Sequence, residues 1–169
     1  SFIIENKVKF PKEVSYSEDL AALVEIYSKH PKVSVLGEEL YNYYQRVDSA
    51  TKQLNNKSLD ICKSIDFIHE VLEENKLYNI FLDELEMCIY LNLFIYVVIN
   101  FNKHNAYNKS LYRMYKKKNI NIIKNQYINE HIGSYNKNGQ VRIRLYNRSY
   151  YLGCFYDYIR KIIKCIINK

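Results

Sequence analysis

The amino-acid sequence predicts an all-α protein, an elongated four-helix-type bundle of long antiparallel helices with a short extra N-terminal helix. The chain has only 4 Gly and 2 Pro in 169 residues, and none of them lies between Glu38 and Ile132. A β-sandwich or barrel would need turn residues about every 8 to 12 positions. Apolar residues instead recur at helical spacing, and the length suits one helical-bundle domain over residues 1–169.

The core of the predicted bundle is a helix over residues 77–101. Apolar side chains fall on nearly every side of this segment, so other helices must enclose it. Its densest part, 89–101, is too short to cross a membrane, which takes about 20 predominantly apolar residues. A buried parallel strand over 95–99 is the alternative. The acidic residues at 83, 84 and 86 and the absence of Gly and Pro favour a helix.

The N-terminal part is expected to contain an arm and two helices. Residues 1–16 lack a period and contain Pro11, which predicts an extended arm lying along a groove. Ser17 is a suitable N-cap for a short helix over 17–30, which must end before Pro31. Apolar residues at intervals of mostly 3 and 4 then predict one long helix over 34–74. The polar patch 53–57 could break that helix in two.

The C-terminal part is expected to contain two more main helices. One runs over 105–132 and is closed by Gly133 in the left-handed conformation. The loop 133–139 follows, and the last helix runs over 147–167. The segment before that helix has two readings. Residues 141–145 alternate like a strand, whereas apolar intervals of 4 and 3 from Val141 to Ile166 favour extending the helix backwards.

Charge divides the chain into an acidic part and a basic part. Residues 1–102 have 10 Lys and Arg against 16 Asp and Glu, and residues 103–169 have 15 against 2. The two parts could neutralise each other across helix faces, or the basic part could form a surface for an anionic partner. The residues expected on that surface are Lys109, Arg113, Lys116, Lys117, Lys118, Lys124, Arg142, Arg144 and Arg148.

The four cysteines form no C-x-x-C pair and have no His at zinc-ligand spacing, so no metal site is expected. If helices 34–74 and 77–101 fold back on each other about residues 74–76, Cys62 and Cys88 come to one level of the hairpin. They could then form a disulfide. Alternatively they remain buried thiols that pack as small apolar residues.

The sequence contains no signature of catalysis. The four His are scattered and neighbour no nucleophile motif, and the four Gly are too dispersed to form a phosphate-binding loop. We therefore expect a protein that is not an enzyme, with no catalytic residues, no cofactor and no small-molecule substrate.

Residues 116–130, KKKNINIIKNQYINE, have the Asn, Lys, Ile and Tyr usage of proteins from AT-rich genomes, malaria parasites above all. In composition, helix layout and absence of Trp, the chain resembles the family of the sporozoite microneme protein essential for cell traversal, small secreted helical bundles without enzymatic activity. No motif residue is matched. The resemblance implies secretion, or residence in a secretory organelle, and action at host-cell membranes. Helical immune modulators of poxviruses share this composition, and a cytoplasmic location is the alternative.

The basic part interleaves Lys and Arg with Tyr, Phe and Ile, as helices at membrane interfaces do. A membrane surface or a host protein is therefore favoured as partner. Nucleic-acid binding is the alternative, because cations alternate with aromatic residues around 112–118 and 142–151. Tyr is equally abundant in the acidic part, which weakens that alternative. The sequence does not indicate an oligomeric state.

Overall fold

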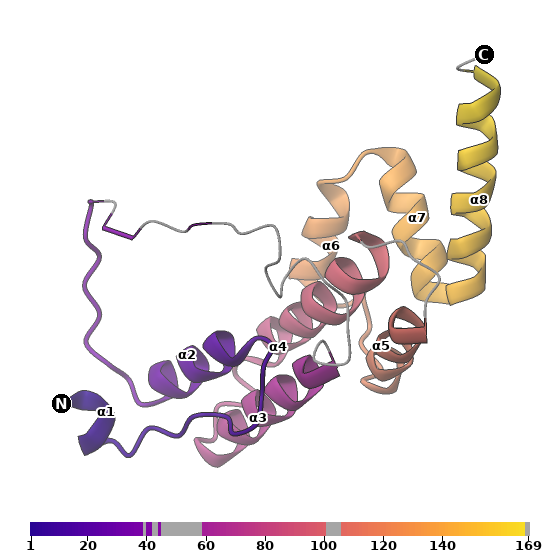
Figure 1. Cartoon of the computed structure of the whole chain (residues 1–169). Helices are drawn as coiled ribbons and strands as arrows, with labels where there is room; N and C mark the ends of the chain where they lie inside the picture. The colour runs from indigo at the N-terminus through magenta and orange to yellow at the C-terminus, as the bar shows by residue number, and fades with distance from the viewer. Residues whose placement is uncertain (39, 42–43, 45–58, 101–105, 168–169) are drawn as a thin grey trace. The chain divides into compact units, whose positions relative to one another are not determined.

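The computed structural model describes residues 1–38, 40–41, 44, 59–100 and 106–167 (Figure 1). In this part of the chain every regular element is a helix, which confirms the all-α prediction. The sequence predicted one domain, whereas contacts group the chain into two compact units, Ser1–Phe81 and Leu82–Lys169. We describe each unit by itself. The predicted packing as four long antiparallel helices stays a prediction.

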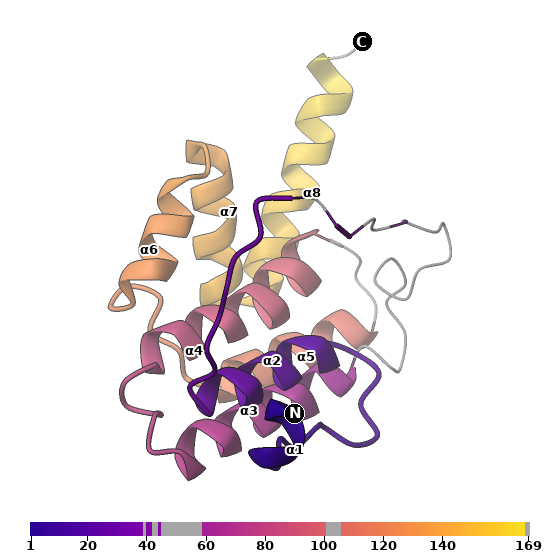
Figure 2. The same cartoon turned by 90° about the vertical axis from the view of Figure 1, so that its left-hand side faces the viewer.

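Unit 1 contains α1 (Phe2–Glu5), α2 (Glu18–Ser28) and α3 (Ile61–Glu74). α2 packs against α3, and the two helices lie side by side in Figure 2. α3 buries one face at helical spacing, and Ala21 of α2 and Tyr16 lie against the same core. The buried apolar residues of α3 are Ile61, Cys62, Ile65, Ile68, Val71 and Leu72.

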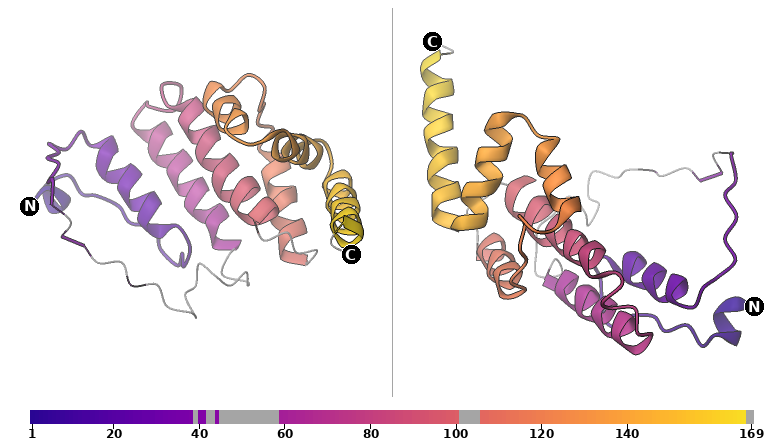
Figure 3. Two further views of the ribbon diagram at one scale, coloured as in Figure 1. Left: turned by 90° about the horizontal axis from the view of Figure 1, so that it is seen from above. Right: turned by 180° about the vertical axis from the view of Figure 1, so that it is seen from behind.

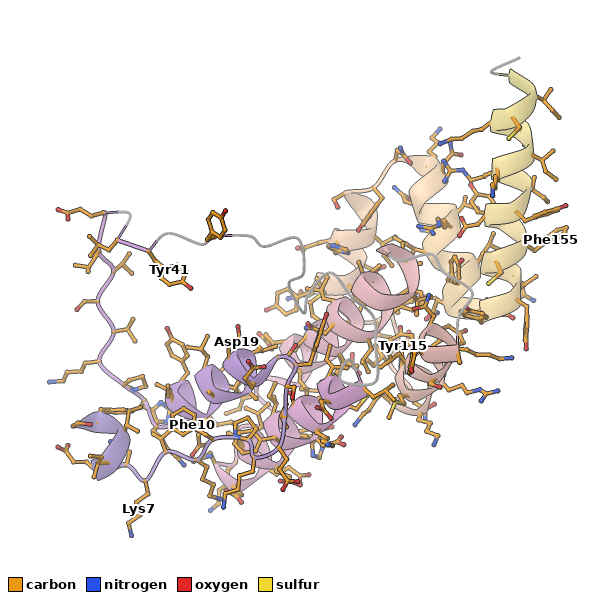
Figure 4. The ribbon with its side chains drawn as sticks, viewed as in Figure 1. Lys7, Phe10, Asp19, Tyr41, Tyr115 and Phe155 are labelled. Carbon is orange, nitrogen blue, oxygen red and sulfur yellow. The ribbon has the colours of Figure 1, made fainter. Side chains whose placement is uncertain are left out.

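The N-terminal arm of unit 1 is attached to its helices by polar contacts. The backbone N–H of Lys9 donates to the buried carboxylate of Glu25 at 3.1 Å, and Lys9 Nζ lies 2.6 Å from Glu74 Oε2. Ser64 Oγ donates to the carbonyl of Tyr16 at 2.6 Å. Lys7, between α1 and these contacts, points away from the helices in Figure 4. The extended arm is therefore confirmed beyond α1, which is a short helix that the sequence did not predict.

Unit 2 is built around one continuous helical rod. α4 (Leu82–Ile89) continues into η3 (Tyr90–Asn100), a π-helical segment in which each N–H bonds to the carbonyl five residues earlier. α5 (Ala106–Lys117) packs on η3, and α6 (Gln126–Gly133) packs on α4. α7 (Lys137–Arg148) packs on both α6 and α8 (Tyr150–Ile167).

The aromatic centre of unit 2 lies on η3. The Phe94 ring stacks on the Tyr115 ring with centroids 4.7 Å apart, and the Tyr90 and Phe94 centroids are 5.5 Å apart. All three side chains are at most 2% exposed. The prediction of a buried core helix is thus confirmed, although the helix begins at Leu82. The other buried apolar residues of the rod are Leu85, Ile89, Leu93, Ile95, Val98 and Ile99.

The helices predicted over 34–74 and 77–101 begin later than expected. Residues 31–38 are not helical, and they contain Val33, Val35 and Gly37, whose helix propensities are low. Residues 45–58, with the possible break at 53–57, lie outside the described residues. After α3, Lys76 adopts a left-handed conformation (φ 59°), and the N–H groups of Leu77 and Tyr78 both bond to the carbonyl of Leu72. This turn keeps 77–81 out of the core helix.

The helix predicted over 105–132 is interrupted by asparagines. Asn119 is left-handed (φ 52°), and Asn121 Oδ1 accepts from the N–H groups of Ile123 and Lys124. Asn125 then caps α6 by accepting from the N–H of Ile128 at 3.1 Å. Asn side chains compete for backbone hydrogen bonds in this way, so they end one helix and start another.

The helix predicted over 147–167 corresponds to α8, which begins three residues later at Tyr150, and the segment before it forms the separate helix α7. Ser149 is extended (φ −157°, ψ 136°) and separates α7 from α8. The helical reading of residues 141–145 is confirmed and the strand reading is wrong. Left-handed closure at Gly133 is also wrong, because Gly133 is the last residue of α6 and no described Gly has a positive φ. Ser17 does occupy the N-cap position of α2, but its side chain makes no capping bond.

Candidate functional site

The predicted basic surface lies on α5, on α7 and on the segment between α5 and α6. Seven of the nine residues are exposed: Arg113, Lys116, Lys117, Lys118, Lys124, Arg144 and Arg148. Lys109 and Arg142 are half-buried. The structure therefore supports an exposed cationic surface on unit 2 for most of the predicted set.

The prediction that Arg142 belongs to the exposed basic surface is corrected by the structure, because its guanidinium holds helices together. Arg142 Nε lies 2.7 Å from Asp157 Oδ1, Arg142 Nη2 donates to Asp157 Oδ2 at 2.9 Å, and Nη2 also donates to the carbonyl of Ile99 at 3.1 Å. The two side chains are only 16% and 10% exposed. Arg142 thus joins α7, α8 and the end of η3, and its charge is neutralised internally.

Lys109 and Lys116 of α5 lie beside the junction of α7 and α8. Lys109 Nζ donates to Tyr151 Oη at 2.6 Å and lies 5.0 Å from the centroid of that ring. Lys116 Nζ donates to the carbonyl of Asn147 at 3.0 Å. The hydrogen bond from Lys109, and next the positive charge of Lys109, lower the pKa of the Tyr151 phenol, with a smaller effect from Arg113. Lys109 therefore contacts the first turn of α8, and Lys116 contacts the last turn of α7.

Most of the exposed large apolar side chains in the described part of unit 2 are on α8, where the sequence predicted only a bundle helix. At about 100° per residue its exposed apolar side chains fall within an arc of about 140°. Phe155 is 62% exposed, and in Figure 4 it points away from α7. We call this set the α8 stripe. It consists of Tyr151, Leu152, Phe155, Tyr158, Ile159, Ile162, Ile163 and Ile166.

The α8 stripe faces outward because the polar face of α8 faces α7. Tyr146 Oη donates to Asp157 Oδ2 at 2.7 Å, beside the Arg142 ion pair. Gly153 lies directly on the Tyr146 ring, and a Cβ atom at this position would be 2.2 Å from Tyr146 Cγ. The absence of a side chain at Gly153 allows α7 and α8 to approach this closely.

The C-terminal half of α8 extends beyond the end of α7 in Figures 1 and 3, so α7 does not cover it. Arg160 and Lys161 lie on the two sides of the α8 stripe, and Lys164 lies opposite its centre. The sequence analysis predicted neither the α8 stripe nor these three cations as part of a functional surface. The available signal was the 3, 4, 3, 4 spacing of Leu152, Phe155, Ile159, Ile162 and Ile166, which was assigned to the core.

The predicted disulfide stays a prediction. Cys62 is buried in α3 and Cys88 is half-buried in α4, in separately described units, and no disulfide bond joins these two residues. Burial raises the pKa of the Cys88 thiol. Among the described residues, no group of His, Cys, Asp and Glu side chains is arranged to hold a metal ion. No described helix combines the length and the hydropathy that a membrane-spanning segment needs.

Comparison with known proteins gives no relative: no protein-family model, no curated protein and no solved structure matches the chain. We therefore infer its function from its residues and their geometry.

Proposed function

We propose that this protein is not an enzyme and that it binds anionic membrane surfaces through α8. The observation that carries the proposal is the exposed α8 stripe with cations on both of its sides. An interfacial helix inserts its apolar face at the boundary between headgroups and acyl chains, while Lys and Arg on the polar face contact the headgroups. α8 has both features and is held on unit 2 with its apolar face outward.

The charges of unit 2 favour an anionic surface over a neutral one. Each Lys or Arg near an anionic leaflet contributes about 1 kcal/mol to binding. α8 carries Arg160, Lys161 and Lys164, whereas its one acid, Asp157, is paired with Arg142. Long cationic side chains can reach the headgroups while their methylene groups lie along the apolar surface.

A partner helix is the main alternative, because Leu152, Phe155, Ile159, Ile162 and Ile166 have the spacing of a coiled-coil seam. In a coiled coil the positions on both sides of this seam carry charges that pair across the interface. In α8 those positions are Tyr156, Tyr158, Ile163 and Cys165. The apolar arc is thus wider than a two-stranded seam, and the positions that would pair charges across such an interface carry none.

The proposed place of action comes from the resemblance described above. It extends the proposal to a secreted protein, or one from a secretory organelle, that acts at host-cell membranes during traversal or invasion. A host protein and a nucleic acid are the alternative partners. The α8 stripe does not favour a nucleic acid, because nucleic-acid binding needs cations where α8 presents aliphatic and aromatic side chains.

Co-sedimentation with liposomes tests the proposal. We expect the protein to sediment with vesicles containing anionic phospholipid and to stay in solution with purely zwitterionic vesicles. The double variant Phe155→Asp/Ile162→Asp should lose binding, because two carboxylates would enter the interface. A control is Ile80→Asp, which changes an exposed Ile (67%) in unit 1 and should bind like the wild type.

Two results would overturn the proposal. One is equal binding by the double variant and the control. The other is a concentration-dependent dimer, or a complex with nonspecific DNA or RNA, that the double variant abolishes while anionic vesicles bind neither protein.

A further inference from the structure

We infer that unit 2 has a second lipid-related site, a groove that binds the anion of a single-chain fatty acid. The groove has a volume of about 430 Å³ and is lined by Ile122, Ile123, Asn129, Ile132, Arg144 and Asn147. These residues come from α6, from α7 and from the segment before α6. The site shares no residue with the α8 stripe, so this inference does not rest on the proposed function.

The apolar part of the groove consists of three isoleucines. Ile122 and Ile132 are only 6% and 4% exposed, whereas Ile123, which also lines the groove, is 78% exposed. Burial of the exposed surface of Ile123 by a ligand is favourable, since apolar transfer is worth about 25 cal/mol per Å². An alkyl chain lying in the groove would cover Ile123 against the other two.

The polar part of the groove offers hydrogen-bond donors on one face of α7. Arg144 is exposed, and no acid among the described residues pairs with it, in contrast to Arg142 two residues earlier. Asn147 lies one turn after Arg144 on the same face. Its Oδ1 accepts from Tyr115 Oη at 3.1 Å, which leaves the amide NH₂ to donate to a ligand.

These donors match a carboxylate. A guanidinium can bind both carboxylate oxygens through two parallel hydrogen bonds, and an amide one turn away can add a third. Among the described residues no acidic side chain lines the groove, so no like charge there repels an anion. Asn129 Nδ2 already donates to the carbonyl of Ile123, so this amide orders the groove wall.

The size and the lining of the groove also indicate which class of ligand fits it. A volume of about 430 Å³ lies within the usual range of small-molecule sites. The lining residues include no aromatic ring on which a nucleobase could stack. An aliphatic surface that ends at one unpaired guanidinium fits an alkyl chain with a terminal anion.

Titration calorimetry with straight-chain carboxylates below their micelle concentrations tests this inference. Each methylene that enters the groove should tighten binding about fourfold, which is the equivalent of 0.8 kcal/mol per CH₂, until the chain outgrows the groove. An alkylamine of the same length should bind at least about tenfold more weakly than the carboxylate, because a cation cannot accept from Arg144.

Matched variants separate this site from the α8 stripe. Arg144→Glu should weaken carboxylate binding at least about tenfold. Arg148→Glu changes another exposed Arg of α7 that does not line the groove, and it should retain binding. Ile123→Asp should weaken binding, while Phe155→Asp/Ile162→Asp should leave it unchanged even where vesicle binding is lost.

The inference is overturned if affinity does not depend on chain length, if the amine binds as well as the carboxylate, or if Arg148→Glu weakens binding as much as Arg144→Glu. Loss of carboxylate binding in Phe155→Asp/Ile162→Asp would also overturn it, because the chain would then lie on the α8 stripe. An alkyl phosphate bound at least tenfold more tightly than the carboxylate would overturn the fatty-acid assignment.

Discussion

α3 and α8 are both amphipathic helices, yet they turn opposite faces to their surroundings. In α3 the apolar face is buried, with Ile61, Ile65 and Ile68 at most 2% exposed, and the polar face is in water. In α8 the apolar face is exposed and the polar face packs on α7 through Asp157. An amphipathic pattern therefore shows which residues share a face, but it does not show which face is covered.

The two helices bury different faces because their polar side chains have different surroundings. The polar side chains of α3 that face away from its core, such as Asp66 and Glu70, are exposed at the surface. The carboxylate of Asp157 instead meets Arg142 and the Tyr146 hydroxyl, so the hydrogen-bonding capacity that it loses to burial is largely replaced. A buried, well-paired acid on one face forces the opposite face of α8 outward.

Asp157→Ala should have the largest effect, because it leaves the largely buried Arg142 without its counter-charge. We expect the free energy of unfolding of unit 2 to fall by about 3–5 kcal/mol, measured by urea unfolding followed by circular dichroism. Arg144→Ala, on the same helix as Arg142, should change the free energy of unfolding by less than about 0.5 kcal/mol. If Asp157→Ala is as mild as Arg144→Ala, the ion pair does not decide which face of α8 is exposed.

The same substitution in both helices tests the comparison directly. Ile65→Ala in α3 should cost about 2–5 kcal/mol, because it removes buried methyl groups and leaves a cavity. Ile162→Ala in α8 should cost less than about 0.5 kcal/mol, because this side chain is 42% exposed. Urea unfolding of both variants gives the two values. Equal costs would show that the α8 stripe is covered in solution.

Gly153→Ala tests the close approach of α7 and α8. The added Cβ would overlap the ring of Tyr146, which is 1% exposed and has little room to move. Overpacking of this kind costs about 1–3 kcal/mol, measurable as a lower midpoint of urea unfolding. Substitution of Ala for Gly usually stabilises a helix, so a gain in stability would mean that the two helices pack less closely than described.

Alkaline pH should weaken the α7–α8 junction by a smaller amount. Burial, and next the hydrogen bond to Asp157, raise the pKa of Tyr146, and burial raises the pKa of Tyr150 to about 12. In the unfolded chain the pKa of Tyr is about 10. Above that pH the folded state binds more protons than the unfolded state, so stability falls as pH rises.

Urea unfolding of the wild type and of Tyr146→Phe at increasing pH checks this expectation. The variant should lose stability less steeply above pH of about 10, because it lacks one of the phenols with a raised pKa. The remaining slope belongs to the other buried tyrosines of unit 2, such as Tyr115, whose pKa is also raised by burial. Parallel pH profiles would exclude Tyr146 as a source of the alkaline loss.

Much of the fold could be predicted because it depends on local patterns. The buried rod of α4 and η3, the short helix α2 and the extended N-terminal arm all follow from apolar spacing, scarcity of Gly and the position of Pro31. The breaks at Asn119, Asn125 and Ser149 were missed. At each break a backbone or side-chain hydrogen-bond geometry competes with a pattern that otherwise continues, and apolar spacing does not record that competition.

The candidate site shows the same limit. Seven of the nine predicted basic residues are exposed, since Lys and Arg are rarely buried without a partner. The role of Arg142 depended on Asp157, 15 residues away, and that pairing is a tertiary contact. Reading α8 as a core helix was reasonable from its apolar spacing alone, because core helices and interfacial helices share that pattern.

By itself the sequence determined that the protein is helical, which segment is most deeply buried and that its C-terminal part is cationic. These properties depend on composition and on the spacing of neighbours along the chain. Only the tertiary structure decided that the apolar face of α8 is exposed and that Arg144 ends an apolar groove. Both depend on which distant polar groups become partners on folding, and hydrogen bonds and ion pairs between distant residues leave no periodic trace in a sequence.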